Sequence, residues 1–382
     1  MHIGLISGEY PPDQGGVGDF TRELGHALAE LGHEVHVIAG ESPTSNIQHP
    51  ITIHRMMSGW RWGCWKQILS LARELELDVL NVQYQAAAYD MHPAINFVPG
   101  KKIRPPVVVT FHDLKVPYLF PKAGPLRRWV VRALAQRADG VIVTNREDEL
   151  QAANSEWQIA NLTRIPIGSN IIPRLSGEHD RDTWRTQWGL EPDDLLLGYF
   201  GFLNESKGGE ELMQTLALLV EQGLPAHLLM IGGRVGSSDP TNQAYAERVE
   251  NLIASLDLNE RVHWSGYANP EEVSAGLLTV DVCVLPYRDG VSFRRGTLHA
   301  CLAHGRAIVT TRPAVSLPQV RDGENMLLTE PRNTKGLAEA AARIAANPTL
   351  RTRLEMGAEA LAAQFTWEHI ARQTAALFRR LA

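Results

Sequence analysis

The segment that decides the fold runs from Asp194 to Leu212 and reads "DLLLGYFGFLNESKGGEEL". An apolar run ends in a polar loop, and Gly208 and Gly209 then open a helix. A buried strand followed by a loop and a helix is the repeating unit of a parallel α/β sheet. Lys207 puts an ammonium group beside the free amides of the helix start, an arrangement suited to holding a phosphate. The alternative, a solvated lysine, is disfavoured there by the helix dipole.

The same alternation of apolar runs and amphipathic helices repeats in two series along the chain. The stretch "RIPIGSNIIPRLSGEHD" (164–180), rich in Pro, Gly and Ser, separates them and reads as a linker. A chain of 382 residues is also too long for one ordinary core. We therefore predict an α/β protein with two doubly wound, Rossmann-like domains, residues 1–172 and 173–364, that face each other across a cleft. Ligands of such sheets bind beyond the carboxyl ends of the strands.

Composition and charge exclude several classes of protein. A net charge of −6 is unsuited to a nucleic-acid binder, which needs excess cations to neutralise phosphates. Three cysteines without a C-x-x-C pair, and no histidine cluster at ligand spacing, indicate a reduced compartment and no metal site. The amino terminus does not read as a signal peptide, and no window approaches the ~20 apolar residues of a membrane span. We expect a cytoplasmic protein.

Two further glycine-containing loops are candidates for binding an anion. "EYPPDQGGVGDF" (9–20) precedes a helix, and Gly15 and Gly16 let backbone amides approach a ligand there, although a plain turn into a helix explains them equally well. "DGVSFRRG" (289–296) precedes the helix "TLHACLAHG" and gathers hydroxyl and guanidinium donors, which bind phosphate oxygens in forked pairs. The alternative is that one of these arginines merely faces solvent. The donors are Ser292, Arg294, Arg295 and Thr297.

Taken together, these motifs resemble the family 4 glycosyltransferases, which have the GT-B fold, and the resemblance covers nearly the whole chain. It includes "EYPP", "GGVG", "FHD", "IPIGSN", "FGFLNESKGG", "VHWSGYANPEEV", "DVCVLPY", "LAHGRAIVTT", "DGENMLL" and "FTWEHIA" in that order. The resemblance implies a hexosyltransferase-type enzyme that takes sugar from a nucleoside diphosphate donor held by the carboxyl-terminal domain. The acceptor would lie on the amino-terminal domain, against which helix 365–382 would pack. Cations and helix ends would replace a metal in stabilising the leaving diphosphate, so no cofactor is expected.

Carried over by motif, the resemblance assigns roles to four positions. Gly15 and Gly16 match the loop near the diphosphate and the acceptor, and Lys207 matches the lysine that binds phosphate. His112 matches a histidine that faces the donor sugar, which makes it a catalytic candidate; a core histidine with its hydrogen bonds satisfied is the alternative.

Two departures from the family pattern concern the donor site. Phe202 stands where the family has an arginine that binds the diphosphate, and Val291 and His299 stand where it has paired glutamates for the sugar and the ribose. We expect Arg294 or Arg295 to restore the lost positive charge. Asp289 would then accept sugar hydroxyls as the second catalytic candidate, and His299 would bond a ribose hydroxyl.

The acceptor is expected to carry a hydroxyl group and to be a glycan, a lipid-linked molecule or a small molecule. Gln83 and Tyr84 follow a buried strand and suit a hydroxyl-rich ligand, although they would suit a satisfied loop equally well. Family resemblance implies retention at the anomeric carbon. Two alternatives stay open: a catalytically silent protein that binds nucleotide sugars, favoured by the absent glutamates, and epimerisation of the sugar, which needs a carboxylate pair that we do not find.

A pair of carboxylates and two segments rich in tryptophan and basic residues each have a functional and a simpler structural interpretation. "DRD" (180–182) could be a metal-binding carboxylate pair, but its position in the linker favours a helix start. "SGWRWGCWKQILSLARELEL" (58–77) leaves Trp60 and Trp62 on a loop beside Arg61 and Lys66, and "GPLRRWVVRALAQRAD" (124–139) mixes Trp129 with arginines. Such basic and aromatic faces can rest on an anionic membrane, so we expect weak peripheral membrane contact; core packing with a solvated polar edge is the alternative.

Overall fold

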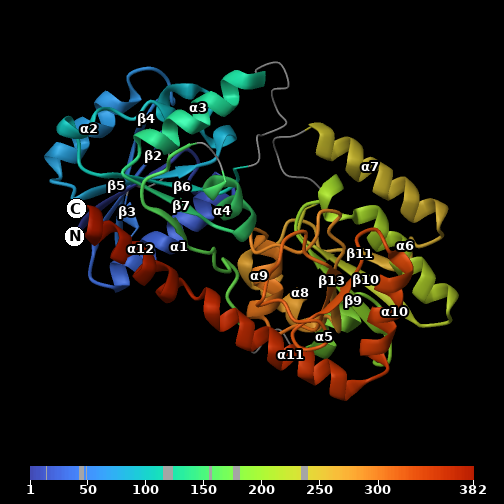
Figure 1. The fold of residues 1–382 in the computed structure, drawn as a ribbon. Helices are drawn as coiled ribbons and strands as arrows, with labels where there is room; N and C mark the ends of the chain where they lie inside the picture. Colours follow the sequence, from blue (N-terminus) through green and yellow to red (C-terminus); the bar gives the residue numbers. More distant parts are fainter. Residues whose placement is uncertain are drawn as a thin grey trace. The chain divides into compact units, whose positions relative to one another are not determined.

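The computed structural model describes residues 1–13, 15–42, 47–48, 50–114, 124–154, 157–174, 181–233 and 240–382. Contacts divide the chain into two compact units (Figure 1). Unit 1 consists of Met1–Asn170 and Phe365–Ala382, and unit 2 of Ile171–Gln364. The sequence placed the boundary at 172/173, in the same linker. The acceptor and donor roles of the two domains stay predictions.

Unit 1 is built on an eight-stranded sheet with the strand order β3-β4-β2-β1-β5-β6-β7-β8. All pairs are parallel except β3 with β4. The order reverses at β1, so β1 and β5 lie in the middle of the sheet, as in a doubly wound fold. The strands are β1 His2–Ser7, β2 Glu34–Gly40, β3 Ile47–Gln48, β4 Ile51–Met57, β5 Val79–Tyr84, β6 Val107–Phe111, β7 Gly140–Val143 and β8 Leu162–Arg164.

Helices cover both faces of this sheet because alternate strand residues point to opposite sides. On one face, Ile3 and Leu5 of β1 share a core with α1 and α12, which pack side by side in unit 1 (Figure 1). On the other face, Ile6 of the same strand shares a core with α2, α3 and α4. The helices are α1 Gly16–Glu30, α2 Cys64–Glu74, α3 Gly124–Arg137, α4 Arg146–Ala153 and α12 Trp367–Leu381, with short 3₁₀ turns η1 Ala86–Tyr89, η2 Pro93–Asn96 and η3 Lys101–Ile103.

Unit 2 is built on a six-stranded, all-parallel sheet with the order β11-β10-β9-β12-β13-β14. The stretch quoted first in the sequence analysis supplies β9, a central strand whose residues Leu195–Tyr199 are buried. Helix α6 packs against α7 and α10, whereas α5 packs on α8 and α9 on α11. The strands are β9 Leu195–Phe200, β10 Ala226–Ile231, β11 Val262–Trp264, β12 Val282–Leu285, β13 Ile308–Thr311 and β14 Leu327–Thr329. The helices are α5 Arg181–Gln187, α6 Gly209–Glu221, α7 Pro240–Ser255, α8 Pro270–Thr279, α9 Gly296–Ala303, α10 Thr334–Ala345 and α11 Pro348–Ala362, with 3₁₀ turns η5 Glu205–Lys207 and η6 Ala363–Phe365.

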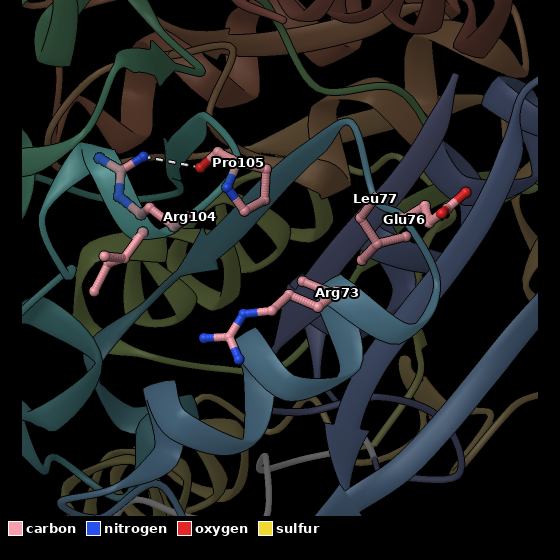
Figure 2. Close-up of a pocket in the computed structure, with 7 residues that line it drawn as sticks. Arg73, Glu76, Leu77, Arg104 and Pro105 are labelled. Carbon is pink, nitrogen blue, oxygen red and sulfur yellow. Dashed lines mark hydrogen bonds between the residues drawn. The ribbon is translucent and has the colours of Figure 1, made fainter.

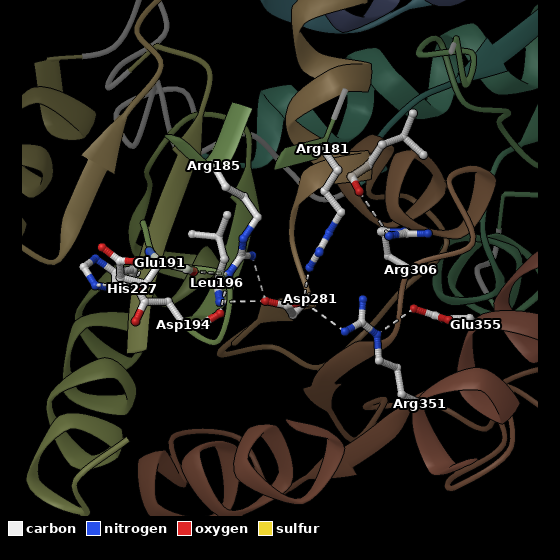
Figure 3. Close-up of polar contacts among 11 residues, drawn as sticks. Arg181, Arg185, Glu191, Asp194, Leu196, His227, Asp281, Arg306, Arg351 and Glu355 are labelled. Atoms are coloured by element: carbon white, nitrogen blue, oxygen red, sulfur yellow. Dashed lines mark hydrogen bonds and ion pairs between the residues drawn. The ribbon is translucent and has the colours of Figure 1, made fainter. Parts of the chain in front are cut away.

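A carboxylate at the amino-terminal edge of this sheet joins several elements of unit 2. Asp281 precedes β12 and is 9% exposed, and it accepts a 2.8 Å hydrogen bond from the amide of Leu196 in β9 (Figure 3). Three guanidinium groups from α5 and α11 also surround it, so the buried charge is fully paired. They belong to Arg181, Arg185 and Arg351, at 2.6, 3.2 and 2.9 Å. The sequence "DRD" (180–182) was predicted to start a helix, and α5 begins at Arg181. Asp180 lies outside the described residues.

Candidate functional site

In unit 2, the loops that follow β9 and β12 are joined at the carboxyl-terminal edge of the sheet. Gly208 has φ +73°, and a Cβ built on it would lie 2.0 Å from the carbonyl oxygen of Pro286, so only glycine fits. The amide of Arg288 donates to the carbonyl of Ser206 at 2.9 Å. The guanidinium of Arg288 forms ion pairs with Glu205, Glu210 and Glu211 around the start of α6. The two loops therefore form one frame for the side chains between them.

Lys207 is half-buried in this frame, and its Nζ donates to the carbonyl oxygen of Phe202 at 2.8 Å. Burial lowers the pKa of this ammonium group to about 8, with a further contribution from the nearby charge of Arg295. Gly201, at φ +106°, lies between the two loops: a Cβ there would be 3.1 Å from Thr297 Oγ1 and 3.5 Å from Lys207 Nζ. A hydroxyl and an ammonium from different loops therefore meet beside exposed backbone, as the phosphate interpretation requires.

Arg295 points toward the same frame. Its two terminal nitrogens lie 3.3 Å from Ser206 Oγ, and its guanidinium carbon lies 4.7 Å from the centre of the Tyr287 ring. Asp289 pairs with Arg295 at 2.6 Å through one carboxylate oxygen and with Arg294 through the other. Both oxygens of Asp289 are thus engaged by guanidinium groups, and its binding to sugar hydroxyls stays a prediction. That Arg294 or Arg295 restores the positive charge absent at Phe202 stays a prediction.

The remaining predicted residues of this loop are buried. Ser292 is 2% exposed and Thr297 is 8% exposed at the start of α9. His299 is 2% exposed, its Nε2 donates to the carbonyl of Phe293 at 2.8 Å, and burial lowers its pKa to about 4. Val291, in the place of the first glutamate, is fully buried. Ribose binding by His299 stays a prediction, and the structure assigns the ring a packing role in the loop.

In unit 1, the predicted residues at the ends of β5 and β6 form a polar chain. His112 Nε2 lies 3.0 Å from Gln83 Oε1; because that oxygen only accepts, Nε2 is the protonated nitrogen. Gln83 in turn donates to Asn81 Oδ1, and Asn81 donates to Thr110 Oγ1 at 3.0 Å. Burial lowers the pKa of His112 to about 4, so this imidazole is neutral at pH 7. Gln83 is fully buried, and an acceptor role for Gln83 and Tyr84 stays a prediction.

The glycine loop of unit 1 already holds an anion from its own chain. Glu9 Oε1 accepts hydrogen bonds from the amides of Val17 and Gly18, at 3.0 and 3.4 Å, at the start of α1. Burial raises the pKa of Glu9. A Cβ on Gly15 would lie 2.1 Å from Glu9 Oε1, whereas one on Gly16 would meet no atom within 4 Å. Binding of a substrate phosphate by Gly15 and Gly16 stays a prediction, and it would have to share these amides with Glu9.

A cavity of about 700 Å³ in unit 1 lies away from these residues (Figure 2). Leu77 precedes β5 and Pro105 precedes β6, so the cavity is at the amino-terminal edge of the sheet, opposite the ends that carry Gln83 and His112. Arg104, in its wall, is occupied by the carbonyl of Pro105 at 2.9 Å and by Asp139. Ligands of such sheets bind at the carboxyl ends of the strands, so we do not expect this cavity to be the substrate site.

Sequence reasoning missed several residues that the structure places in these sites. Ser206 lies beside Lys207 in "NESKGG" but was not singled out, and Tyr287 lies under Arg295. The ring of Phe20 in α1 lies edge-on to His112 with centroids 4.7 Å apart. The signal available for Ser206 was its hydroxyl group next to Lys207, which is predicted to bind phosphate. Glu9 gave no such signal, because only the folded loop brings it to the helix start.

Comparisons with known proteins now bear on this arrangement. The model of "Glycosyltransferase Family 4" matches residues 14–168, and that of "Glycosyl transferases group 1" matches residues 194–347. The chain belongs to glycosyltransferase family 4. The two matches fall on the two units and together cover most of this family 4 chain.

Individual relatives of this family 4 protein agree with that assignment. D-inositol 3-phosphate glycosyltransferase of Rhodococcus erythropolis is 27% identical over 60% of this chain, but the match spans only 51% of that relative's length. N-acetyl-alpha-D-glucosaminyl L-malate synthase of Bacillus anthracis is 23% identical over 95% of this chain and 93% of its own. Anabaena HepE, solved with UDP and glucose, has a TM-score of 0.74 at 18% identity, covering 99% of each chain.

These comparisons confirm the predicted α/β class and the GT-B fold of the family 4 protein. The matched family models and the relatives named above are those of glycosyltransferases. Over the described part of the chain, no group of three His, Cys, Asp or Glu side chains is arranged to hold a metal ion. No helix in the same residues is long and apolar enough to cross a membrane.

Proposed function

We propose that this family 4 protein transfers a sugar from a nucleoside diphosphate sugar to an acceptor hydroxyl. The observation that carries the proposal is the meeting of Lys207 and Thr297 beside Gly201, with Arg295 held on Ser206 of the same frame, beyond the carboxyl ends of β9 and β12. Two cations, hydroxyl groups and a helix start in one frame are what a pyrophosphate needs, and they suit the charge that develops on a departing diphosphate. The bound UDP and glucose of the similar Anabaena structure support a nucleotide-sugar donor.

The reaction proposed here breaks the bond between the anomeric carbon and the diphosphate oxygen, and the electron pair leaves with the diphosphate. The acceptor oxygen bonds to the anomeric carbon and gives its proton to the departing phosphate, on the same face, so that configuration is retained. Lys207 and Arg295 hold the developing charge in place of a metal ion. His112 is neutral, as its low pKa and its hydrogen bond to Gln83 indicate, and it can orient the sugar by hydrogen bonding without adding charge.

Two parts of the proposal concern the acceptor and the location. The printed names of the relatives specify D-inositol 3-phosphate and L-malate, both of which carry hydroxyl groups, and we infer a hydroxyl acceptor here as well. Residues Gln83 and Tyr84 lie at the end of β5 and are buried, so their proposed acceptor role requires that this strand end opens to the acceptor. We place the reaction in the cytoplasm, with peripheral membrane contact that is argued in the next subsection.

The competing proposal is a silent protein that binds nucleotide sugars without transferring them. It is favoured by the burial of Val291 and His299 where the family has paired glutamates. Incubation of the purified protein with UDP-glucose, followed by measurement of free UDP with and without candidate acceptors, separates the two. Saturable UDP-glucose binding without UDP release, repeated across other donors and acceptors, would establish the silent protein. Turnover unchanged by EDTA, with an α-linked product by NMR, supports the metal-free retaining reaction.

Replacing both Arg294 and Arg295 by alanine tests the proposed diphosphate frame. Each charge-assisted hydrogen bond contributes about 1.5–3 kcal/mol, so we expect turnover to fall by at least about 100-fold. The single variants separate the two arginines: Arg295→Ala should account for most of the loss, because Arg295 contacts Ser206 and lies close enough to Lys207 to affect its pKa. Wild-type turnover in the double variant would show that the loop is structural only.

A further inference from the structure

A row of aromatic rings lies on the outer side of the helix layer formed by α2, η2 and α3 in unit 1. We call it the aromatic row: His92, Trp62, Phe97 and Trp129, with successive centroids 5.5, 5.5 and 5.8 Å apart. Its two tryptophans are 67% and 55% exposed, among the largest apolar exposures in the described chain. Two exposed tryptophans joined by one partly buried phenylalanine form an apolar patch that is unusual for a face that meets only water.

Core packing does not explain this row. Trp60 and Trp65 from the same stretch are 3% and 7% exposed, and Trp65 Nε1 donates to the carbonyl of Ile95 at 3.1 Å. The core of this face is thus filled by the neighbours of Trp62, whose own ring lies outside it. The sequence "WRWGCW" (60–65) alternates inward and outward tryptophans, and only the inward ones serve the fold.

The segments that carry the row have an extreme charge bias. Residues 58–69, 91–104 and 124–137 contain nine Lys or Arg residues and no Asp or Glu, in a chain whose net charge is −6. Arg137 places its guanidinium carbon 5.5 Å from the centre of the Phe97 ring, so cation and row are in contact. Asp139, just beyond the third segment, pairs with Lys101 and Arg104. The outward-facing cations include Arg61, Lys66 and Arg128, all of which are exposed.

We propose that this face of unit 1, the aromatic row with its surrounding cations, rests on an anionic phospholipid surface. Tryptophan rings partition into the headgroup region of a bilayer, and lysine and arginine gain about 1 kcal/mol each from an anionic leaflet. Charge complementarity selects this partner: the cations are spread over three segments rather than aimed at one point, which suits a diffuse, laterally extended anion. A soluble polyanion would need fewer aromatic rings and more converging donors.

The face is connected to a residue predicted to bind the acceptor. Asn96, in η2 beneath the row, donates to the hydroxyl of Tyr84 at 2.9 Å and to the carbonyl of Val130 in α3 at 3.4 Å. Tyr84 ends β5, so one side chain separates the membrane-facing layer from the strand ends. This link rests on the proposed function, and it favours the lipid-linked acceptor among the three classes considered. Membrane binding itself does not depend on transfer.

Flotation of the full chain with vesicles tests the proposal. We expect the protein to float with vesicles of phosphatidylcholine containing phosphatidylglycerol, to stay behind with phosphatidylcholine alone, and to be released by high salt. Replacing Arg61, Lys66 and Arg128 by serine should lower the apparent vesicle affinity by about 100-fold. Replacing Trp62 and Trp129 by alanine should lower it by about tenfold or more.

Matched controls come from exposed residues of unit 2. Replacing Arg321, Lys335 and Arg353 by serine removes the same charge from another surface, and Tyr267→Ala removes a ring that is 74% exposed; both should float like the wild type. Circular dichroism establishes that each variant is folded. Three results would overturn the proposal: no flotation with either vesicle, equal flotation with both, or equal losses in the control and test variants.

Further measurements keep this proposal separate from the proposed function. Binding to a soluble polyanion such as heparin, without flotation, would reassign the face to a soluble partner and overturn the membrane proposal. UDP binding and UDP release are measured on the same preparations. If the protein floats but releases no UDP, the membrane proposal is supported and the transferase proposal is overturned. If it releases UDP but does not float, the transferase proposal is supported and the membrane proposal is overturned.

Discussion

At the scale of single residues, Lys207 shows how burial and charge act on one group. Its Nζ is held by the Phe202 carbonyl at 2.8 Å and lies near enough to Arg295 for the two cations to repel. Burial of the ammonium group and the charge of Arg295 both penalise the protonated form, which is why its pKa is about 8 rather than near 10.5. A diphosphate bound between Lys207 and Arg295 would relieve that repulsion. Binding of an anion would therefore remove an unfavourable interaction between these two cations.

This arrangement predicts a pH dependence of UDP binding. The protonated lysine binds the anion, so affinity should be highest below pH 8 and should fall as pH rises through 8 to 9, with proton uptake on binding in that range. The phosphate groups of UDP add no titration there, because they ionise near about pH 6. Calorimetry in two buffers of different ionisation enthalpy measures the proton uptake.

Lys207→Ala and Lys207→Arg serve as the matched variants for this measurement. Alanine should lower UDP affinity by about 10- to 100-fold at pH 7 and flatten the pH profile, since one charge-assisted hydrogen bond is lost. The arginine of Lys207→Arg keeps its charge above pH 9. The affinity of this variant for UDP should therefore be equal to or lower than that of the wild type, and it should not fall between pH 8 and pH 9. A wild-type pH profile in the alanine variant would show that another group titrates.

At the scale of elements, the turn between η5 and α6 is the part of unit 2 that tolerates least change. Gly208→Ala combines a left-handed backbone with a Cβ 2.0 Å from the Pro286 carbonyl, whereas Gly223→Ala has a similar φ of +80° and no atom within 4 Å. We expect Gly223→Ala to cost about 1 kcal/mol of unfolding free energy and Gly208→Ala about 2–3 kcal/mol more. Urea unfolding measures both.

UDP affinity provides the second readout for this pair of variants. Only Gly208→Ala should also weaken UDP binding, because relief of the clash moves Lys207 away from Gly201. Equal losses of unfolding free energy in the two variants would mean that the backbone at Pro286 moves away from the new Cβ with little loss of stability. The loops after β9 and β12 would then not be rigidly joined at this contact.

The elements themselves were largely predictable, and those that were not share a physical reason. Eleven of the strands follow apolar runs that the sequence displays, from "HIGLIS" to "NMLLTE". The strands β4 and β8 were not expected; β8 is an edge strand, and β4 has only the two-residue strand β3 beyond it. Thr52 and Arg55 interrupt the apolar pattern of β4, and the residues of β8, "LTR", are half-buried or exposed. Edge strands need not be buried on both faces, so hydrophobicity marks them poorly.

The site was predictable in its parts but not in its contacts. The sequence indicated Lys207, Arg294 and Arg295 because charged residues that follow an apolar run can be recognised from the order of the residues alone. It could not show that Asp289 bridges the two arginines or that His299 turns back to its own loop, since both depend on where the chain folds over itself.

At the scale of the whole molecule, histidines shape the response to acid. Burial lowers the pKa of His112, His227 and His299 to about 4, well below the ordinary 6.5. As pH falls below 6.5, the unfolded chain takes up protons that the folded chain does not, so stability falls with decreasing pH down to about 4. Each fully buried histidine contributes up to about 1.4 kcal/mol per pH unit over that range.

Chemical unfolding at pH 7.5 and pH 5 measures this loss. His299→Gln should reduce the difference between the two pH values by about 2 kcal/mol, because His299 is almost fully buried. The comparison is of the differences, since the substitution also affects stability at pH 7.5 through the Phe293 hydrogen bond. An undiminished difference in the variant would show that this ring is protonated in the folded protein.

The position of α12 has a consequence for how the first unit is made and for how it can be exchanged. Trp367 donates to the carbonyl of Ser169, 198 positions earlier, and Ile370 and Phe378 complete a core begun by Ile3 and Phe20. During synthesis, a nascent chain that has emerged only as far as Asn170 therefore carries an unfinished apolar face until the ribosome has translated the whole of unit 2. For the same reason, a chimera that takes unit 1 from a relative must take the returning helix with it, so such grafts need two junctions rather than one.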